Sequence, residues 1–413
     1  MKMRYFLLSA MFSIMSVSAY AADSIRDMIS QSTGSFELRV RSFDRDYDTT
    51  PAKDRNESAI GGLLRFKSAD LHGVSFGVSM YNAGDFYSDD DKGGYDLLTN
   101  NDSEKHKGFT KMGEAYLQGN WFDTVFKVGA HEINTPYANK HDSRVAPRSY
   151  KGASVVSDIV PNLTMSAYYI TDFIDHGDTT FDNIAKSYAT GMEDNPLLIG
   201  GLKYNLSLSE NASVKPQAWY YTIRDGLSMT YLDTEFSTKV NDFTFSFLPS
   251  YLQQKAIGDK TGGDFDTDLY GATATAEAYG FSVQVAYARV GDDDIQTPWG
   301  HSLIINQNIL GADTAGVKSY AAIAGYDFSG LGADGLDFSI SYAKYESPDS
   351  GANASYDASE TDYEINYKPK YLKGLALRAS YGVSDTDGTF NSSDATDTRF
   401  LMTYAVKFGE GRK

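Results

Sequence analysis

The sequence predicts an all-β protein, a closed, up-and-down antiparallel β-barrel of 18 strands that crosses a membrane. Three observations predict it. Apolar and polar residues alternate in many short segments, the connections between these segments alternate between short and long, and the last segment carries apolar side chains at every second position from Phe400 to Phe408. Tight turns on one rim and long loops on the other are typical of transmembrane barrels in bacterial outer membranes.

The first strands are defined by polar loops and tight turns. In the first of them Phe36, Leu38 and Val40 alternate with charged residues, and the third follows a short turn around Asp70. Long polar stretches follow the first and third strands, and Pro161 marks a later turn. This spacing predicts strands at 36–43, 57–67, 73–81, 110–120, 123–131, 152–158 and 161–171.

Short turns and long loops also alternate between the remaining strands, with long loops at 172–196 and 291–316. Apolar residues alternate with polar ones from Leu202 to Ser209 and from Asp337 to Tyr342. Strands are expected at 197–208, 213–223, 228–238, 241–252, 267–279, 280–290, 317–328, 335–346, 358–369, 373–384 and 397–408.

Alternation by itself also fits a soluble sandwich, in which the apolar face points into a core. Strands of about ten residues suit a tilted bilayer crossing, and an even number of strands closes the sheet without leaving an open edge. A barrel of 16 strands is the alternative count, with the segments 152–158 and 267–279 as loops.

The first 21 residues have the features of a secretory signal peptide. Lys2 and Arg4 are basic, 5–15 is mostly apolar, and Ala19-Tyr20-Ala21 matches a small-x-small cleavage site. The expected domain organisation is therefore a signal peptide at 1–21 and a single barrel domain at 22–413.

Composition agrees with a barrel that faces lipid on one side and water on the other. Mean hydropathy is −0.38, and the chain has no cysteine, 30 Tyr and 23 Phe. Tyrosine suits a membrane–water interface. A net charge of −18 makes nucleic acid a poor partner. The acidic runs 89–91 and 292–294 are interpreted as solvated loop tips. Divalent cations shared with lipopolysaccharide, or a cation-attracting mouth, are the alternatives.

The segment 131–153, HEINTPYANKHDSRVAPRSYKGA, resembles the OprD family of outer-membrane porins. The start of the chain also resembles that family's opening hairpin. The chain departs from the pattern at its end, where residues 409–413 follow the aromatic Phe408. The matching pieces are Thr135-Pro136, Ala138-Asn139, Asp142-Ser143-Arg144, Pro147, Gly152-Ala153, Arg41, Arg45-Asp46 and Gly61-Gly62.

The resemblance implies that residues 132–151 are a third extracellular loop that folds into the barrel and narrows it. Its expected pore-facing groups are Asp142, Ser143, Arg144 and Arg148. The resemblance also implies a row of basic groups on the wall opposite this loop. Strand alternation points six basic side chains inward, namely Arg39, Arg41, Arg65, Lys67, Lys127 and Arg378. Each could instead form a structural ion pair.

Fixed charges of both signs in a narrow channel focus the field on a passing ion and orient a solute with separated charges. The sequence therefore favours passive, partly selective diffusion of small nutrients, with carboxylates or amino acids preferred. A general non-selective trimeric porin and a structural barrel with a plugged lumen are the alternatives. Expected partners are outer-membrane lipid and lipopolysaccharide, the barrel-assembly machinery and small polar solutes, in a monomer or loose homotrimer of a Gram-negative outer membrane.

An enzyme is not expected. A hydrolase on this scaffold would need a serine, a histidine and an acid or amide in register, and none of the six histidines lies in a recognisable nucleophile motif. Metal-ligand spacing is also absent from the sequence, and the function needs no cofactor because the solute's own gradient drives the flux.

Overall fold

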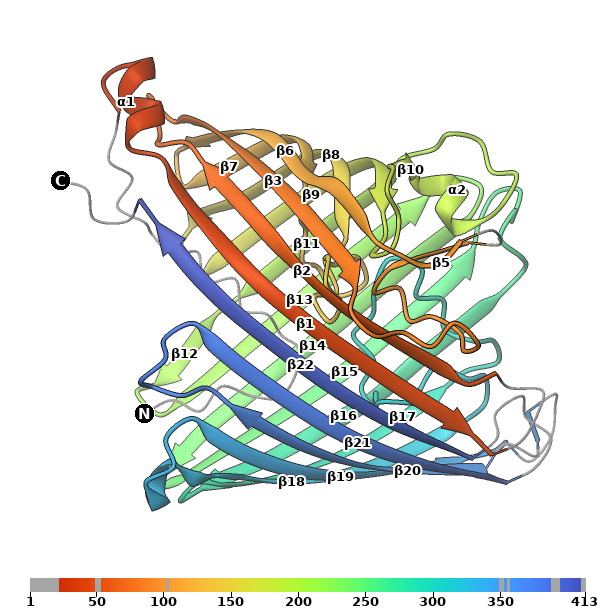
Figure 1. Ribbon diagram of the computed structural model, residues 1–413. Helices are drawn as coiled ribbons and strands as arrows, with labels where there is room; N and C mark the ends of the chain where they lie inside the picture. Colours follow the sequence, from red (N-terminus) through yellow and green to blue (C-terminus); the bar gives the residue numbers. More distant parts are fainter. Residues whose placement is uncertain are drawn as a thin grey trace.

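The computed structural model describes residues 22–48, 53–101, 104–348, 353–354, 357–387 and 394–409 (Figure 1). The expected signal peptide and the last four residues of the tail lie outside these ranges. The strands run diagonally around one barrel, and both ends of the described chain lie on the same rim.

Strands make up nearly all of the regular structure. The helical turns within the described ranges are α1 (Ile25–Ser30), α2 (Ile184–Tyr188) and the 3-10 turn η1 (Phe328–Leu331). The strands are β1 (Thr33–Tyr47), β2 (Arg55–Lys67), β3 (Val74–Asp85), β4 (Thr99–Asn101), β5 (Glu104–Lys107), β6 (Phe109–Trp121), β7 (Thr124–His131), β8 (Ser149–Val160), β9 (Leu163–Ile174), β10 (Asp182–Asn183), β11 (Leu197–Tyr204), β12 (Leu206–Ser209), β13 (Ala212–Ile223), β14 (Leu227–Val240), β15 (Phe243–Ala256), β16 (Asp266–Ala278), β17 (Phe281–Val290), β18 (Lys318–Asp327), β19 (Leu336–Glu346), β20 (Asp357–Tyr367), β21 (Leu375–Asp387) and β22 (Ala395–Phe408).

The sheet closes because β1 pairs antiparallel with β2 on one side and with β22 on the other. β11 and β12 form one barrel strand that is interrupted at Asn205, the two-residue β10 only extends the edge beside β9, and β4 and β5 form a separate hairpin. The barrel therefore has 18 strands, as predicted. The 16-stranded alternative is wrong, because β8 and β16 occupy the two segments it treats as loops.

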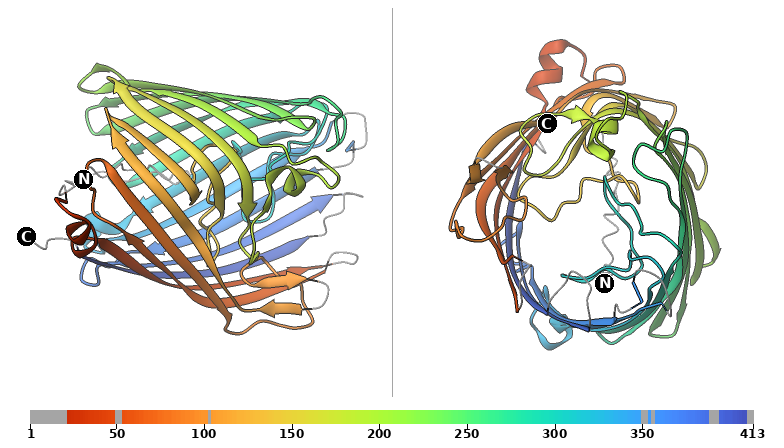
Figure 2. Two further views of the ribbon diagram at one scale, coloured as in Figure 1. Left: turned by 90° about the horizontal axis from the view of Figure 1, so that it is seen from above. Right: turned by 90° about the vertical axis from the view of Figure 1, so that its right-hand side faces the viewer.

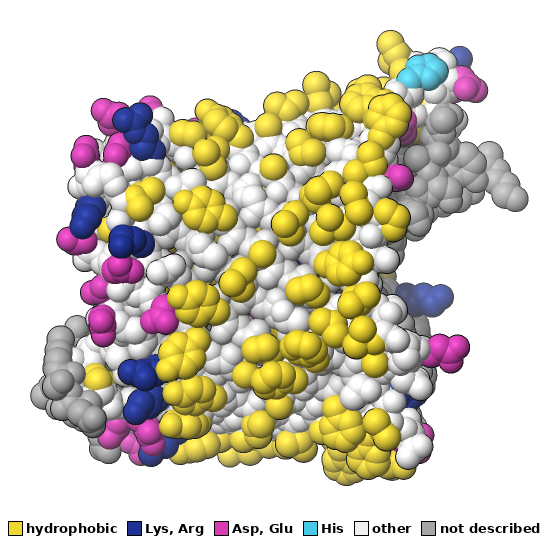
Figure 3. Space-filling view, turned by 180° about the vertical axis from the view of Figure 1, so that it is seen from behind, with side chains coloured by type: hydrophobic (Ala, Val, Ile, Leu, Met, Phe, Trp, Pro, Cys, Tyr) yellow, Lys and Arg dark blue, Asp and Glu magenta, His cyan; other side chains and the backbone are white. Residues whose placement is uncertain are grey.

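Side chains alternate between the lumen and the outer surface along each strand. In β17, Val283 and Val285 are each 53% exposed on the outer surface, whereas Ala286 and Ala288 face inward and are buried. The outward residues form a broad apolar belt, with charged side chains gathered along its edge (Figure 3). This arrangement lets a chain of low mean hydropathy present an apolar surface to lipid.

The two rims differ in their connections. Tight two-residue turns with positive φ close β6–β7 at Phe122-Asp123 and β16–β17 at Tyr279-Gly280, a geometry that matches the right-handed twist of a hairpin. The opposite rim carries the long connections, including 132–148 and 291–317. Over the residues described, the structure has no helix of the length and apolarity that crossing a bilayer requires.

The core lies inside the barrel, where long loops fold back into the lumen (Figure 2). The larger cluster of buried apolar side chains joins these loops to β8, β9, β11, β13–β17, β19 and β20, and the smaller one lies against β1–β3. The expected inward loop is shorter than its predicted range 132–151, because residues 149–151 belong to β8: all three pair with β9, and residues 150–151 also pair with β7.

Candidate functional site

The segment 132–148, called the constriction loop below, leaves β7 and turns back on itself inside the barrel. The turn is built on Thr135-Pro136, where the Thr135 backbone N–H and hydroxyl both donate to the carbonyl of Ala138, at 2.9 and 2.8 Å. Proline suits the second position of such a turn because its φ is already fixed. Below the turn, the N–H of Lys140 donates to the carbonyl of Ile133.

Tyr137 anchors this turn to the barrel wall. Its side chain is fully buried, and its ring packs edge-on against Tyr221 of β13 and Tyr231 of β14, with centroid distances of 6.3 and 5.4 Å. The Tyr137 backbone N–H donates to the Tyr221 hydroxyl at 3.2 Å. Aromatic pairs of this geometry add to the free energy gained from burying the rings.

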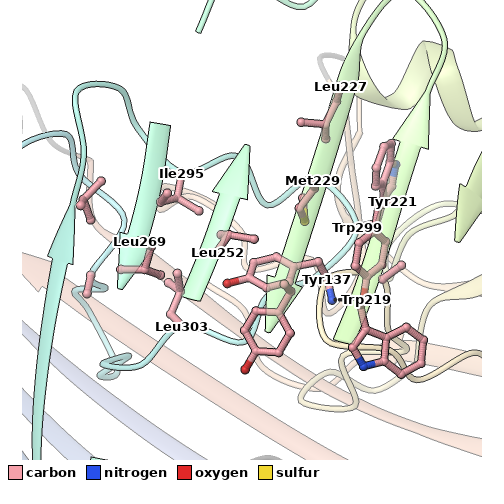
Figure 4. Close-up of a cluster of buried hydrophobic side chains, with 14 of the residues drawn as sticks. Tyr137, Trp219, Tyr221, Leu227, Met229, Leu252, Leu269, Ile295, Trp299 and Leu303 are labelled. Carbon is pink, nitrogen blue, oxygen red and sulfur yellow. Dashed lines mark hydrogen bonds between the residues drawn. The ribbon is translucent and has the colours of Figure 1, made fainter. Parts of the chain in front are cut away.

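A second inward segment, 291–317, packs onto the constriction loop around Trp299 (Figure 4). The carbonyl of Trp299 accepts from the Asn139 N–H at 3.1 Å and from the Tyr150 hydroxyl at 2.8 Å. Its indole N–H donates to Ser187 at 3.1 Å. Trp299 is fully buried, so the two loops form one packed unit.

The far end of this second loop reaches the opposite wall. Glu360 of β20 accepts from the N–H groups of Ile309 and Leu310 at 2.8 and 2.7 Å. Arg45 of β1 donates to the carbonyl of Asn308 at 2.8 Å. Wall side chains of both signs therefore cap a loop whose backbone groups would otherwise lack partners in the lumen.

Asp142 is the loop residue that meets the predicted basic wall. Its carboxylate lies 2.6 Å from Nη1 of Arg39 and 3.5 Å from Nζ of Lys140, and its side chain is 31% exposed. Burial alone would raise the pKa of Asp142, but Arg39 and Lys140 hold it below its ordinary value. The carboxylate is therefore charged at neutral pH and points toward the channel wall.

Arg39 and Arg65 are tied into a network of alternating charge. Glu37 lies 2.7 Å from Arg39 and 2.8 Å from Arg65, and Arg65 also contacts Glu132 at 2.8 Å. Tyr81 donates to Glu132 at 2.6 Å. These two wall arginines are thus members of structural ion pairs as well as groups that line the lumen.

The other predicted wall residues differ in their surroundings. The Lys127 ammonium lies 4.7 Å from the ring centroid of Tyr116, and Lys67 is exposed near the end of β2 on the short-turn rim.

The two remaining wall arginines differ from each other. Arg378 pairs with Glu364, whereas Arg41 donates to the carbonyl of Met402 at 2.7 Å. In the part of the chain the structure describes, Arg41 has no carboxylate within 4.0 Å, and its Nε has no hydrogen-bond partner.

Arg144 and Arg148 lie in different environments. Arg144 donates to the carbonyl of Tyr95 at 2.7 Å and to the Ser143 hydroxyl at 2.9 Å, and no described carboxylate lies within 4.0 Å of it. Burial, together with nearby Arg399, lowers the pKa of Arg144 to about 10. Arg148 instead makes two hydrogen bonds to the Asp175 carboxylate, at 2.8 and 3.2 Å.

Three histidines from three loops meet beside these arginines. Nδ1 of His141 lies 3.2 Å from Nε2 of His176, and the ring centroid of His301 lies 5.7 Å from that of His141. Nδ1 of His176 donates to the carbonyl of Ala146 at 2.7 Å, so its Nε2 accepts from His141. Burial, then Arg148, lowers the pKa of His141 to about 3 and that of His301 to about 4.

Sequence reasoning missed part of this site. Arg45 and Arg399 lie on the lumen face of β1 and β22, as strand alternation alone could have indicated. The carboxylate partners and the histidine contact depend on segments far apart in the chain, so no local pattern marked them. Among the described residues, no three His, Asp or Glu side chains are arranged to hold a metal ion.

Comparisons with known proteins agree with this architecture. A family model described as outer membrane porin, OprD family, matches residues 26–408. The porin-like protein GalP of Pseudomonas putida is 22% identical over 388 residues, covering 92% of each chain. The crystal structure of Pseudomonas aeruginosa OpdK with vanillate superposes with a TM-score of 0.81 at 19% identity, over 92% of this chain and 100% of that one. P. aeruginosa OccK9 (OpdG) gives 0.82 at 20% identity, with the same coverage.

Proposed function

Since this chain belongs to the OprD family of outer membrane porins, we propose that it is a partly selective diffusion channel with carboxylates or amino acids as preferred solutes. Members of this family are channels rather than enzymes and pass small nutrients across the outer membrane of Gram-negative bacteria. The solute's own gradient would drive the flux, so the proposal needs no cofactor.

The proposed class of solute is based on the presence of both acidic and basic side chains at the constriction. The loop carboxylate of Asp142 faces Arg39, while Arg41 and Arg144 are basic groups that have no described carboxylate within 4.0 Å. Charges on low-dielectric walls act strongly on a solute in a narrow channel. The basic groups would attract a carboxylate, and Asp142 would favour an ammonium on the same solute.

The neighbour solved with vanillate, an aromatic carboxylate, supports the same chemical class. A second candidate is a barrel with a closed lumen, which the packing of two loops around Tyr137 and Trp299 favours. We further propose contacts with lipopolysaccharide, folding by the barrel-assembly machinery, and a monomer or loose homotrimer.

The decisive experiment is single-channel recording of the refolded mature protein in a planar bilayer, with a salt gradient to measure the reversal potential. Small, charge-selective openings that added carboxylates or amino acids block would support the proposal. Large, unselective steps in groups of three would favour a general trimeric porin. The absence of openings from correctly folded protein would favour the closed barrel.

Two variants test the constriction. Arg144→Ala and Arg148→Ala should each widen the pore and shift selectivity toward cations. The shift should be larger for Arg144, because Asp175 already neutralises Arg148. Arg224→Ala is the matched control, since that side chain is 79% exposed in an outer turn. Unchanged conductance and selectivity in both constriction variants would show that Arg144 and Arg148 do not line the constriction.

A further inference from the structure

We propose that three cations on the outer wall, Arg289, Lys318 and Lys344, bind a phosphate of a phosphorylated glycolipid in the outer leaflet of the membrane. The proposal depends on the outer-membrane location and not on what the channel transports. It concerns the ends of β17, β18 and β19 that adjoin the long loops.

The register of these strands places the three cations side by side. Arg289 of β17 lies directly opposite Lys318 of β18, and Lys344 of β19 lies opposite Tyr320, one outward position along β18 from Lys318. Side chains directly opposite each other on neighbouring strands have Cβ atoms about 5 Å apart, and diagonal neighbours about 7–8 Å. One phosphate group could therefore contact all three.

All three side chains point toward lipid rather than into the lumen. Arg289 shares its face with Val285, and Lys344 shares its face with Tyr342, which is 48% exposed. The inward neighbours Ser319 and Ala343 are fully buried. The cations therefore lie at the border of the apolar belt. Figure 3 shows that Lys and Arg side chains gather along an edge of this belt on the face that it draws.

Arg289 and Lys318 lie opposite each other as a like-charge pair, and Lys318 lies opposite Glu346 on its other side. Like charges directly opposite on a sheet destabilise it. Within the described ranges, neither side chain has a carboxylate within 4.0 Å: the Arg289 contact is the Tyr270 hydroxyl, at 3.3 Å. Lys344 pairs with Glu346 at 2.8 Å. The three cations outnumber their two nearest acidic neighbours, Glu346 and Asp268, so an external anion would complete the cluster.

The surroundings favour a glycolipid over a simple phospholipid. A hollow of about 430 Å³ adjoins Arg289, and its aromatic, amide and acidic side chains can stack on a sugar or hydrogen-bond its hydroxyls. These side chains are Tyr251, Tyr270, Gln253, Asp266, Asp268 and Asp292. On the membrane side of the cations, the rings of Tyr287 and Tyr320 lie 5.3 Å apart, as is typical of an interfacial belt. The phosphate would contact the three cations, the sugar would lie in the hollow, and the acyl chains would lie against the apolar belt.

The test is native mass spectrometry of the refolded protein in detergent, titrated with diphosphoryl lipid A. The double variant Arg289→Gln with Lys318→Gln should bind about tenfold more weakly, since each basic group near an anionic lipid surface contributes measurably to binding. The matched control is Lys239→Gln with Lys370→Gln, which removes two positive charges from exposed positions at the opposite rim.

The proposal also requires that phosphatidylethanolamine bind more weakly than lipid A and that millimolar inorganic phosphate fail to displace lipid A. It is overturned if the double variant binds lipid A normally, if the control loses as much affinity, or if free phosphate competes. A mass that shows a second copy of the chain bound through this face, lost in the double variant, would also overturn it. Retained β-sheet circular dichroism and heat-resistant migration in gels would show that the variants fold.

Discussion

The lumen has two unlike walls, and the constriction loop touches both. The aromatic wall, defined by Trp219, Tyr221 and Tyr231, receives the buried Tyr137. The charged wall comprises the lumen faces of β22, β1, β2, β3, β6 and β7, where Arg39 receives Asp142. Apolar packing thus determines where the loop lies, whereas the ionic contacts determine the field that a passing solute experiences.

The side chains of the two walls differ in how far they are exposed to water, and this explains why one wall positions the loop and the other determines the field. Tyr137 and Trp299 are fully buried, while the side chains of Asp142 and Arg65 are 31% and 21% exposed. Burying a large apolar side chain stabilises by about 1.5–3 kcal/mol, whereas a solvated ion pair contributes about 0–1 kcal/mol. Changes on the aromatic side should therefore affect stability most, and changes on the charged side should affect selectivity most.

The largest effect is expected for Trp299→Ala. Removing a buried tryptophan should destabilise the packing of the two inward loops by about 3–5 kcal/mol, because Trp299 is their common centre. We expect higher and noisier single-channel conductance, together with faster protease cleavage within 291–317. Trp121→Ala is the control, since Trp121 is 43% exposed at a short turn. Equal effects of the two substitutions would contradict the role of the aromatic wall.

The next effect is expected for Asp142→Asn on the charged wall. Loss of the carboxylate leaves Glu37 as the one described carboxylate within 4.0 Å of Arg39, at a cost of about 1–3 kcal/mol given the partial exposure of Asp142. The removed negative charge should shift selectivity toward anions, measured as a change in reversal potential. A double-mutant cycle with Arg39→Gln isolates the pair, and full additivity would show that the two residues do not interact.

Acidification should loosen the contact between loops through the histidines. The pKa values of His141 and His301 are lowered from 6.5 to about 3 and about 4, by burial and then by Arg148. When the loops separate, these histidines regain their ordinary pKa. The separated loops therefore bind more protons than the packed loops between pH 6.5 and 4. The packing is most stable above pH 6.5 and weakens as pH falls through this window.

The measurement is open-channel noise at pH 7, 5 and 4. Wild type should become noisier as the pH falls, and His301→Gln should respond less because one titrating group is gone. His72→Gln at a short turn is the control and should behave as wild type. A channel equally quiet at pH 7 and pH 4 would show that these histidines do not hold the loops.

The sequence predicted the barrel far better than the partners inside it. Alternation along one strand, as from Phe36 to Arg41, is a local signal that reports which face each side chain occupies, and it predicted an inward direction for Arg39, whose guanidinium lies 2.6 Å from Asp142. Contacts such as His141 with His176 or Asn308 with Arg45 join segments that only the closed barrel brings together. Single-sequence periodicity contains no information about such pairs.

The smallest effect is expected for two lysines that make the same kind of contact on opposite walls. Lys127 lies 4.7 Å from the ring centroid of Tyr116 on the charged wall, and Lys203 lies 5.3 Å from that of Trp219 on the aromatic wall. Each substitution to Gln should cost only about 0.5–1 kcal/mol. If solutes follow the charged wall, Lys127→Gln should shift the reversal potential toward cation selectivity, by less than Arg144→Ala, while Lys203→Gln leaves it unchanged. Equal shifts would mean that ions use both sides of the lumen, and the division between a packing wall and a conducting wall would fail.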